Sequence, residues 1–130
     1  ILRRAHLFFG NETEVRAALR FARLRKPEDL LAHVDQVVMT LGRRGSLVLT
    51  RDGGVHRIPR VPPRRVIDVT GAGDAYRAGF YAGMSRGHEP GRCGLLGSAA
   101  ASFAVEARGT QTNVPRWEDV VRRASRFEDV

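Results

Sequence analysis

Residues 71–74, Gly-Ala-Gly-Asp, stand where an apolar run ends and a helical pattern begins. Glycines let a backbone come close to a ligand and adopt positive φ, so that successive N–H groups point into one concavity. A helix that starts there adds unpaired N–H groups and the positive end of its dipole, which favour an anion such as a transferring phosphoryl group. Asp74 could then accept the proton of an attacking hydroxyl. On spacing alone, a simple turn with Asp74 as the helix cap is an equal alternative.

Two other segments could bind a nucleotide or its metal ion. Asn11 and Glu14 have N-x-x-E spacing, which fits a helix capping box and also fits a polar pair that orders Mg²⁺ and its waters; on spacing alone the capping box is favoured. Residues 40–45, TLGRRG, fit a hairpin connection and equally a turn that passes close to phosphates. The Walker sequence G-x-x-x-x-G-K-[ST] does not occur in the chain, which disfavours an ordinary P-loop NTPase.

Alternating strands and helices would hold these segments. Apolar runs predict strands, and helical spacing predicts helices, over these ranges: strands 5–9, 37–41, 46–51, 55–61 and 66–69; helices 15–22, 27–34, 74–85, 91–107 and 117–124. The turn residues 52–54, Asp-Gly-Gly, predict an antiparallel hairpin, and Pro59 places its second strand at a sheet edge. The alternation predicts an α/β layered fold.

The composition narrows the classes of protein and partner. The 130 residues fit one domain, and 42% hydrophobic content is enough for a buried core. A net charge of +8 allows a polyanionic partner, but the arginines are scattered and no nucleic-acid-binding motif accompanies them, so we expect no nucleic-acid partner. Cys93 is the only cysteine, which fits the reducing cytoplasm, our expected location. The longest apolar stretches are too short to span a membrane, so we expect no membrane partner.

The order N-x-x-E, T-x-G-x-x-G and D-x-T-G-A-G-D-A-[FY]-x-A-G-F resembles that of the ribokinase-like, or PfkB, family of carbohydrate and nucleoside kinases. The third motif, at residues 68–80, is long and specific. The resemblance covers residues 1–130 and implies the C-terminal, ATP-binding and catalytic portion of the family's domain, without the N-terminal substrate and lid half. It implies an α/β fold in which helices flank a mostly parallel sheet.

The resemblance also implies roles for the residues of the longest motif. Asp74 would be the base that activates the substrate hydroxyl. The anion hole would use three backbone positions: Gly71, Ala72 and Gly73. Val69 stands where many relatives have threonine, which leaves the motif intact but loosens an assignment to ribokinase itself.

Other positions would hold the implied cofactors, which are ATP with Mg²⁺ and, in many family members, a monovalent cation such as K⁺. Asn11 and Glu14 would organise Mg²⁺. The nucleotide-binding turn would use Thr40, Gly42 and Gly45. A monovalent-cation site would use, mostly through backbone carbonyls, Asp68, Thr70, Ala104, Ala107 and Gly109.

The implied activity is ATP-dependent transfer of a γ-phosphoryl group to a hydroxymethyl group of a sugar or nucleoside. The segments DAYRAGF, RCGLLGSAAASFAVE and RGTQ look most like bacterial adenosine kinases and their sugar-kinase neighbours, which places adenosine slightly ahead of ribose or fructose. The family also leads us to consider a homodimer for the full-length protein. The alternative is a truncated, non-catalytic kinase remnant that at most binds nucleotide.

Overall fold

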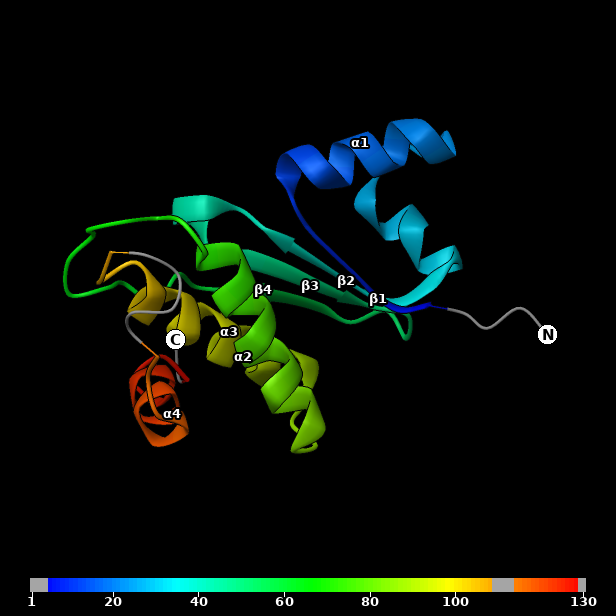
Figure 1. Ribbon diagram of the computed structural model, residues 1–130. Coiled ribbons are helices and arrows are strands. Elements are labelled where there is room, and N and C mark those ends of the chain that lie inside the picture. The colour runs from blue at the N-terminus through cyan, green and yellow to red at the C-terminus, as the bar shows by residue number, and fades with distance from the viewer. Residues whose placement is uncertain (1–4, 109–113, 129–130) are drawn as a thin grey trace.

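The computed structural model describes residues 5–108 and 114–128. Its elements, in chain order, are β1 Ala5–Asn11, α1 Glu12–Ala22, a 3₁₀ helix Pro27–Ala32, β2 Val34–Thr40, a 3₁₀ turn Gly42–Arg44, β3 Ser46–Thr50, β4 Val55–Ile58, α2 Ala72–Ser85, α3 Pro90–Ala104 and α4 Trp117–Ser125. The strands form one sheet in the order β1-β2-β3-β4 (Figure 1).

The sheet mixes parallel and antiparallel pairs. β1 pairs with β2 in parallel, and α1 makes the crossover between them. β2 with β3, and β3 with β4, are antiparallel, so the predicted hairpin and the edge position of β4 are confirmed. The α/β class is confirmed, but parallel pairing does not predominate among the described strands. The turns after Thr40 and Thr50 are short, and a short turn can join only antiparallel neighbours.

Helices cover both faces of the sheet because successive strand residues point to opposite sides (Figure 1). Val37 packs with Val15 and Leu19 of α1 in one core, as the helical spacing of 15–22 predicts. Its neighbour Val38 packs in a second core, beneath α2 and α3, with Phe80. Burial on both faces fixes the register of β2, and therefore the level at which its last residue reaches the end of the sheet.

Glycines let α2 and α3 pack closely. A Cβ at Gly79 of α2 would lie 2.8 Å from the carbonyl oxygen of Leu96, and one at Gly97 of α3 would lie 2.8 Å from that of Tyr76. Any larger side chain would push the helices apart. The pair therefore forms a fixed support for the N-terminus of α2.

Some predicted boundaries are wrong. Residues 66–69 form no strand; the run follows two prolines, and its apolar side chains Val66 and Val69 line a cavity instead of joining the sheet. α2 begins at Ala72, two residues before the predicted start. α3 spans 90–104 rather than 91–107, because the chain turns at Val105 and offers that carbonyl to the 66–69 segment.

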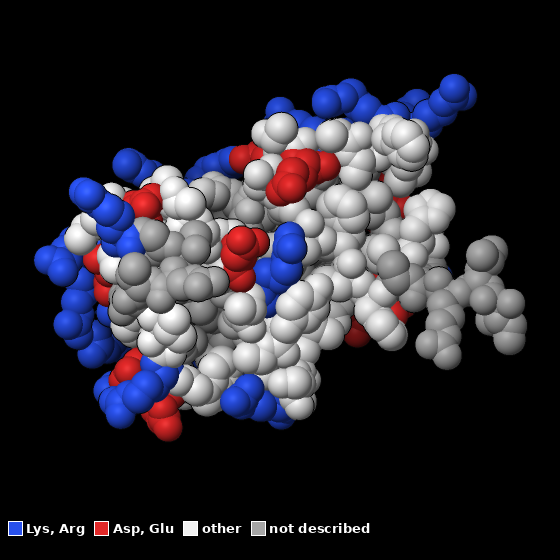
Figure 2. All heavy atoms as spheres, in the orientation of Figure 1, with Lys and Arg blue, Asp and Glu red and all other residues white. Residues whose placement is uncertain are grey.

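Charged side chains are spread over the surface. Figure 2 shows Lys and Arg over α1 and around the end that carries α4, with acidic side chains between them. On this face the basic groups form no single compact patch. Within the described residues, none of the helices combines the length and apolar character needed to cross a bilayer.

Candidate active site

Two of the three motifs meet where β1 and β2 end. Asn11 and Thr40 are register partners in the last positions of these parallel strands. α1 starts directly after Asn11, and the 3₁₀ turn Gly42–Arg44 follows Thr40. An ion pair between Glu12 and Arg44 joins the two segments. In α/β sheets, ligands bind at such carboxyl ends of parallel strands.

The third motif is tied to the same end of the sheet. The hydroxyl of Tyr76, in the second turn of α2, lies 2.5 Å from Oγ of Ser46, the first residue of β3. Both side chains are buried, and burial raises the pKa of the Tyr76 phenol, which therefore stays neutral at physiological pH. This bond places the start of α2 beside the glycine turn that precedes Ser46 (Figure 1).

The N-terminus of α2 offers unpaired donors. Gly71 is the N-cap, with φ of 83° and no side-chain cap. The Ala72 amide donates to Val69 at 3.2 Å, and the Ala75 amide donates to Gly71 at 2.9 Å. Between them, the amides of 73 and 74 have no hydrogen-bond partner within the described part of the chain. They lie at the positive end of the helix dipole, an arrangement that attracts an anion.

Asp74 is the third residue of α2, and its side chain is exposed. The alternative in which Asp74 caps the helix is wrong, because Gly71 holds the cap position. No hydrogen bond or ion pair of the Asp74 carboxylate is found among residues 5–108 and 114–128. Its oxygens are therefore available to a bound molecule.

A cavity of about 300 Å³ joins the glycine turn to the start of α2. Gly42 and Gly45 line it on one side, and Ala72 and Tyr76 on the other. The rest of its wall combines two arginines with small and apolar residues: Arg43, Arg60, Val61, Pro63, Val66, Val69, Ser98, Ala101, Ser102 and Val105. An apolar wall with arginines and a helix N-terminus suits a molecule that is apolar at one end and anionic at the other.

A second cavity of about 400 Å³ contains Asp74. Gly71 and Asp74 form one part of its wall, and small residues of α2 and α3 form much of the rest. Residues 71–74 thus contribute to both cavities, since Ala72 lines the first, and Gly71 and Asp74 line the second. A group placed at the turn could be reached from either side.

The two glycines of the 42–45 turn serve different purposes. Gly42 has φ of 62°, and a Cβ there would meet no atom within 4 Å. A Cβ at Gly45, where φ is 87°, would lie 2.0 Å from the carbonyl oxygen of Ile58 in β4. Gly42 therefore leaves open space beside the cavity, whereas Gly45 is required for β4 to pack.

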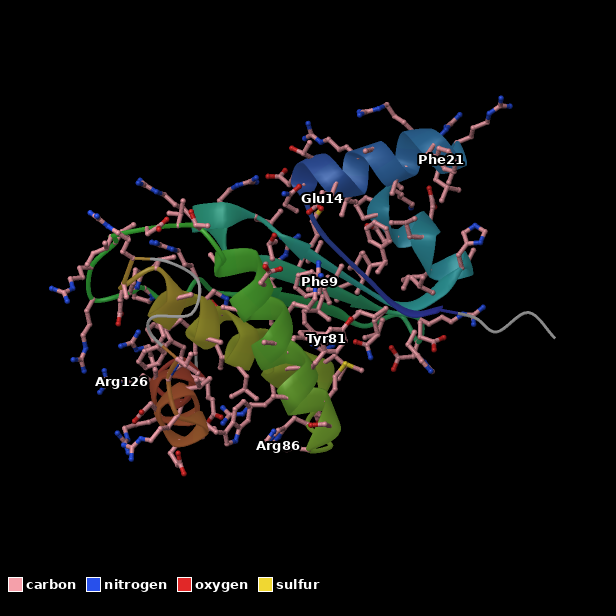
Figure 3. The ribbon with its side chains drawn as sticks, in the orientation of Figure 1. Phe9, Glu14, Phe21, Tyr81, Arg86 and Arg126 are labelled. Atoms are coloured by element: carbon pink, nitrogen blue, oxygen red, sulfur yellow. The ribbon has the colours of Figure 1, made fainter. Side chains whose placement is uncertain are left out.

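Asn11 and Glu14 form the capping box that their spacing favours. The Asn11 Oδ1 accepts from the Glu14 amide at 2.8 Å, and Glu14 Oε1 accepts from the Asn11 amide at 2.9 Å. Figure 3 shows Glu14 in the first turn of α1. The second oxygen of the carboxylate lies outside this box, so the pair fits a metal ion held through water. No cluster of three or more His, Cys, Asp or Glu is found in the described ranges.

Two segments of the implied cation site lie together. The amides of Ile67 and Asp68 both donate to the Val105 carbonyl, at 2.7 and 3.2 Å. The Thr70 amide donates to Asp68 Oδ1 at 2.9 Å. These bonds bring the segment that contains Asp68 and Thr70 to the C-terminal end of α3, where Ala104 and Ala107 lie. Gly109 falls outside the described residues.

The comparisons with known proteins agree with this arrangement. The model of the pfkB family carbohydrate kinases matches residues 1–117. The chain belongs to the PfkB family. A nucleoside kinase of Methanocaldococcus jannaschii is 42% identical over 123 residues, which are 95% of this chain and 40% of the relative. Its crystal structure, described as an archaeal member of the ribokinase family, superposes with a TM-score of 0.88 at 41% identity over 93% of this chain and 40% of the other.

Two further solved structures share the fold. A Burkholderia thailandensis nucleoside kinase in complex with ADP-inosine has a TM-score of 0.88 at 27% identity, over 97% of this chain and 39% of that one. Arabidopsis thaliana ribokinase complexed with ribose and ATP has a TM-score of 0.76 at 26% identity, over 92% and 40%. This PfkB chain thus spans about 40% of the length of these relatives.

Sequence reasoning missed several residues that border the candidate site. Arg43 and Arg60 border the 300 Å³ cavity, and Ser46 holds Tyr76 beside it. No motif marks them, because each reaches the site through packing between distant segments. The one available signal was the position of Arg43 inside the T-x-G-x-x-G turn.

Proposed function

We propose that the protein containing this chain is an ATP-dependent phosphotransferase that moves a γ-phosphoryl group to a hydroxymethyl group of a nucleoside or sugar. The observation that carries the proposal is the cavity shared by Gly42 and Ala72, which joins the glycine turn to the helix N-terminus. Family membership supports the same activity. Relatives solved with ADP-inosine, and with ribose and ATP, support ATP as the donor.

Each group has a distinct task in this proposal. The apolar wall of the 300 Å³ cavity would receive the base of ATP, and its phosphates would pass Gly42 toward the unpaired amides of 73 and 74. Those amides would stabilise charge on the transferring group. Asp74 would take the proton of the attacking hydroxyl, which makes the oxygen a better nucleophile.

Two cations would complete the site. Asn11 and Glu14 would hold Mg²⁺ through its waters, and the ion would neutralise phosphate charge when bound. K⁺ would be held by Asp68, Thr70 and Ala104, together with Ala107 and Gly109. The location in the cytoplasm and the homodimer stay predictions, as does the assignment of residues 1–130 to the C-terminal half of the domain.

A nucleoside is the proposed acceptor, with adenosine ahead of ribose and fructose. The support is that two relatives, which are 42% and 47% identical to this chain, are nucleoside kinases. A panel of adenosine, inosine, cytidine, ribose and fructose, followed by ADP release, would rank the acceptors. A sugar turned over faster than every nucleoside would contradict this choice without contradicting kinase activity.

Asp74→Asn tests the reaction itself. The variant is made in the full-length protein that contains residues 1–130. We expect Asp74→Asn to lower its turnover by about 10²-fold or more, since a positioned base contributes on that scale. ATP affinity should change little, because the amides of 73 and 74 are untouched. Turnover is measured by ADP release and affinity by calorimetry.

Asp119→Asn is the matched control. Asp119 is the third residue of α4, as Asp74 is of α2, but it lies outside the cavities at the glycine turn and at Asp74. Its variant should keep full turnover. If Asp74→Asn kept full turnover, Asp74 would not be the base of the reaction. ATP binding without ADP release from the unsubstituted protein, across the whole acceptor panel, would favour the non-catalytic remnant.

A further inference from the structure

Arg123 of α4 is a buried charge that takes no part in the proposed reaction. Its side chain is 9% exposed. Nη1 donates to Glu106 Oε2 at 2.7 Å and to Ser102 Oγ at 2.9 Å, and the guanidinium lies 3.5 Å from the centre of the Phe103 ring. A buried guanidinium needs this many partners, since an uncompensated one would be strongly destabilising.

Glu106 connects Arg123 to the segment that begins at Arg64. The same oxygen, Oε2, accepts from the backbone amide of Arg64 at 2.7 Å. The adjacent carbonyl of Val105 accepts the amides of Ile67 and Asp68. The side chain of Arg123 therefore fixes the carboxylate to which the start of residues 64–70 is bonded. Figure 3 shows α4, labelled at Arg126, on the side of α3 away from α1.

Residues 64–70 have little burial of their own to hold them. Val66, Ile67 and Val69 are 56%, 48% and 70% exposed. The segment leads directly into Gly71, the cap of α2, and two of its side chains line the 300 Å³ cavity. Its position thus depends on the backbone bonds to Val105 and Glu106 more than on packing.

We propose that Arg123 is a positioning residue: through Glu106 it holds residues 64–70, and so sets the placement of the Gly71–Asp74 turn. The part of this inference that concerns catalysis rests on the proposed function. The part that concerns the segment does not, and hydrogen exchange tests it without any enzymatic assay.

The experiment compares Arg123→Met, Arg123→Lys and Glu106→Gln in the longest expressed reading frame. Amide exchange is followed by mass spectrometry under conditions where denaturant titration shows every variant folded. In Arg123→Met we expect exchange of peptides covering 64–70 to rise by about 5-fold, the factor that corresponds to losing one net hydrogen bond. Peptides from β2 and β3 should keep their rates.

Conservative variants separate positioning from general stability. Arg123→Lys keeps the charge and should show a smaller rise, and Glu106→Gln keeps an oxygen for the Arg64 amide while losing the ion pair. Asp119→Asn is the control, because Asp119 lines the same cavity as Arg123 and Glu106 but pairs with Arg116 and Arg122 instead of with them. It should leave exchange of 64–70 unchanged. Unchanged exchange in Arg123→Met, or an equal rise in β2 and β3, would overturn the proposal.

Kinetics give the second readout. We expect kcat of Arg123→Met to fall by about 10-fold or more, since a misplacement of about 1 Å caused by a distant substitution can cost as much as about 10²-fold. Arg123→Lys should restore part of it. Faster exchange with normal kcat would overturn the catalytic part. If the unsubstituted protein showed no phosphotransferase activity, the proposed function would be wrong. The hydrogen-exchange result would still test whether Arg123 holds residues 64–70.

Discussion

Gly73 is a residue whose type the fold does not explain. Its φ is not in the left-handed region, and a Cβ there would meet no atom within 4 Å. Glycine near the start of a helix weakens it relative to alanine. Gly71 next to it differs, because its φ of 83° suits glycine. A ligand that lies against the backbone at 73 would account for the missing side chain.

Gly73→Ala should therefore separate stability from activity. We expect the free energy of unfolding to stay the same or to rise by about 0.5–1 kcal/mol, because alanine favours the helix. We also expect turnover to fall, because the new methyl group would occupy space beside the unpaired amides of 73 and 74, which we propose face the transferring phosphoryl group. Urea titration and ADP release measure the two effects.

Gly71→Ala is the contrasting variant, since positive φ strains alanine and should lower the free energy of unfolding by about 1 kcal/mol. If Gly73→Ala kept full turnover, no ligand would approach the backbone at that residue.

At the scale of elements, one hydrogen bond between Tyr76 and Ser46 joins α2 to β3 inside the core. Leaving one partner unsatisfied costs more than removing both, because a buried polar group then loses water without a replacement. We expect Tyr76→Phe to lower the free energy of unfolding by about 1–3 kcal/mol. Adding Ser46→Ala should recover part of that loss.

A double-mutant cycle by urea titration measures the recovery, with Tyr81→Phe as control for a tyrosine whose ring is half exposed. Strictly additive losses in Tyr76→Phe and Ser46→Ala would show that the bond does not couple the two elements.

Local patterns predicted most of these elements. Asp52-Gly53-Gly54 predicted the β3–β4 hairpin, and Val15 with Leu19 predicted the buried face of α1. The run 66–69 was misread because its apolar side chains look like those of a strand, yet they line a cavity formed with Ala101 and Val105. Whether an apolar run becomes a strand or the wall of a cavity depends on segments that are far away in sequence.

The candidate site divides in the same way. Motif spacing marked Asn11, Thr40 and Asp74 as candidates, because each belongs to a motif that is contiguous in sequence; their roles stay predictions. Motif spacing could not predict the Arg123–Glu106 pair, because its two residues lie 17 positions apart in sequence. The segment that the pair holds, residues 64–70, is a third part of the chain. Spacing also could not separate the capping box from a metal site, because both use the same side chains.

At the scale of the whole molecule, acid should weaken the fold through exposed carboxylates. Hydrogen bonds from the Lys26 amide and then the Arg25 amide lower the pKa of Asp29, and the Thr50 hydroxyl and then the Gly54 amide lower that of Asp52. Both pKa values lie below the unfolded value near 3.8. Their contribution to stability is therefore present above pH ~4 and is lost as pH falls through the folded values.

We expect the urea midpoint to fall between about pH 5 and pH 2, because the unfolded chain binds more protons there. Asp29→Asn should make this fall shallower, and Asp52→Asn should do the same. Midpoints measured at several pH values test both. A fall as steep in the double variant as in the unsubstituted protein would assign the acid sensitivity to other groups.

The contact between Gly45 and β4 limits what genetics can report about the turn. A side chain at Gly45 would collide with the Ile58 carbonyl whether or not a nucleotide ever binds. In a mutational scan scored by cellular abundance, position 45 would report on folding, while position 42, with open space around it, could report on ligand. Lost activity at position 45 therefore carries no information about the nucleotide, and only a score that separates abundance from activity can assign the two glycines.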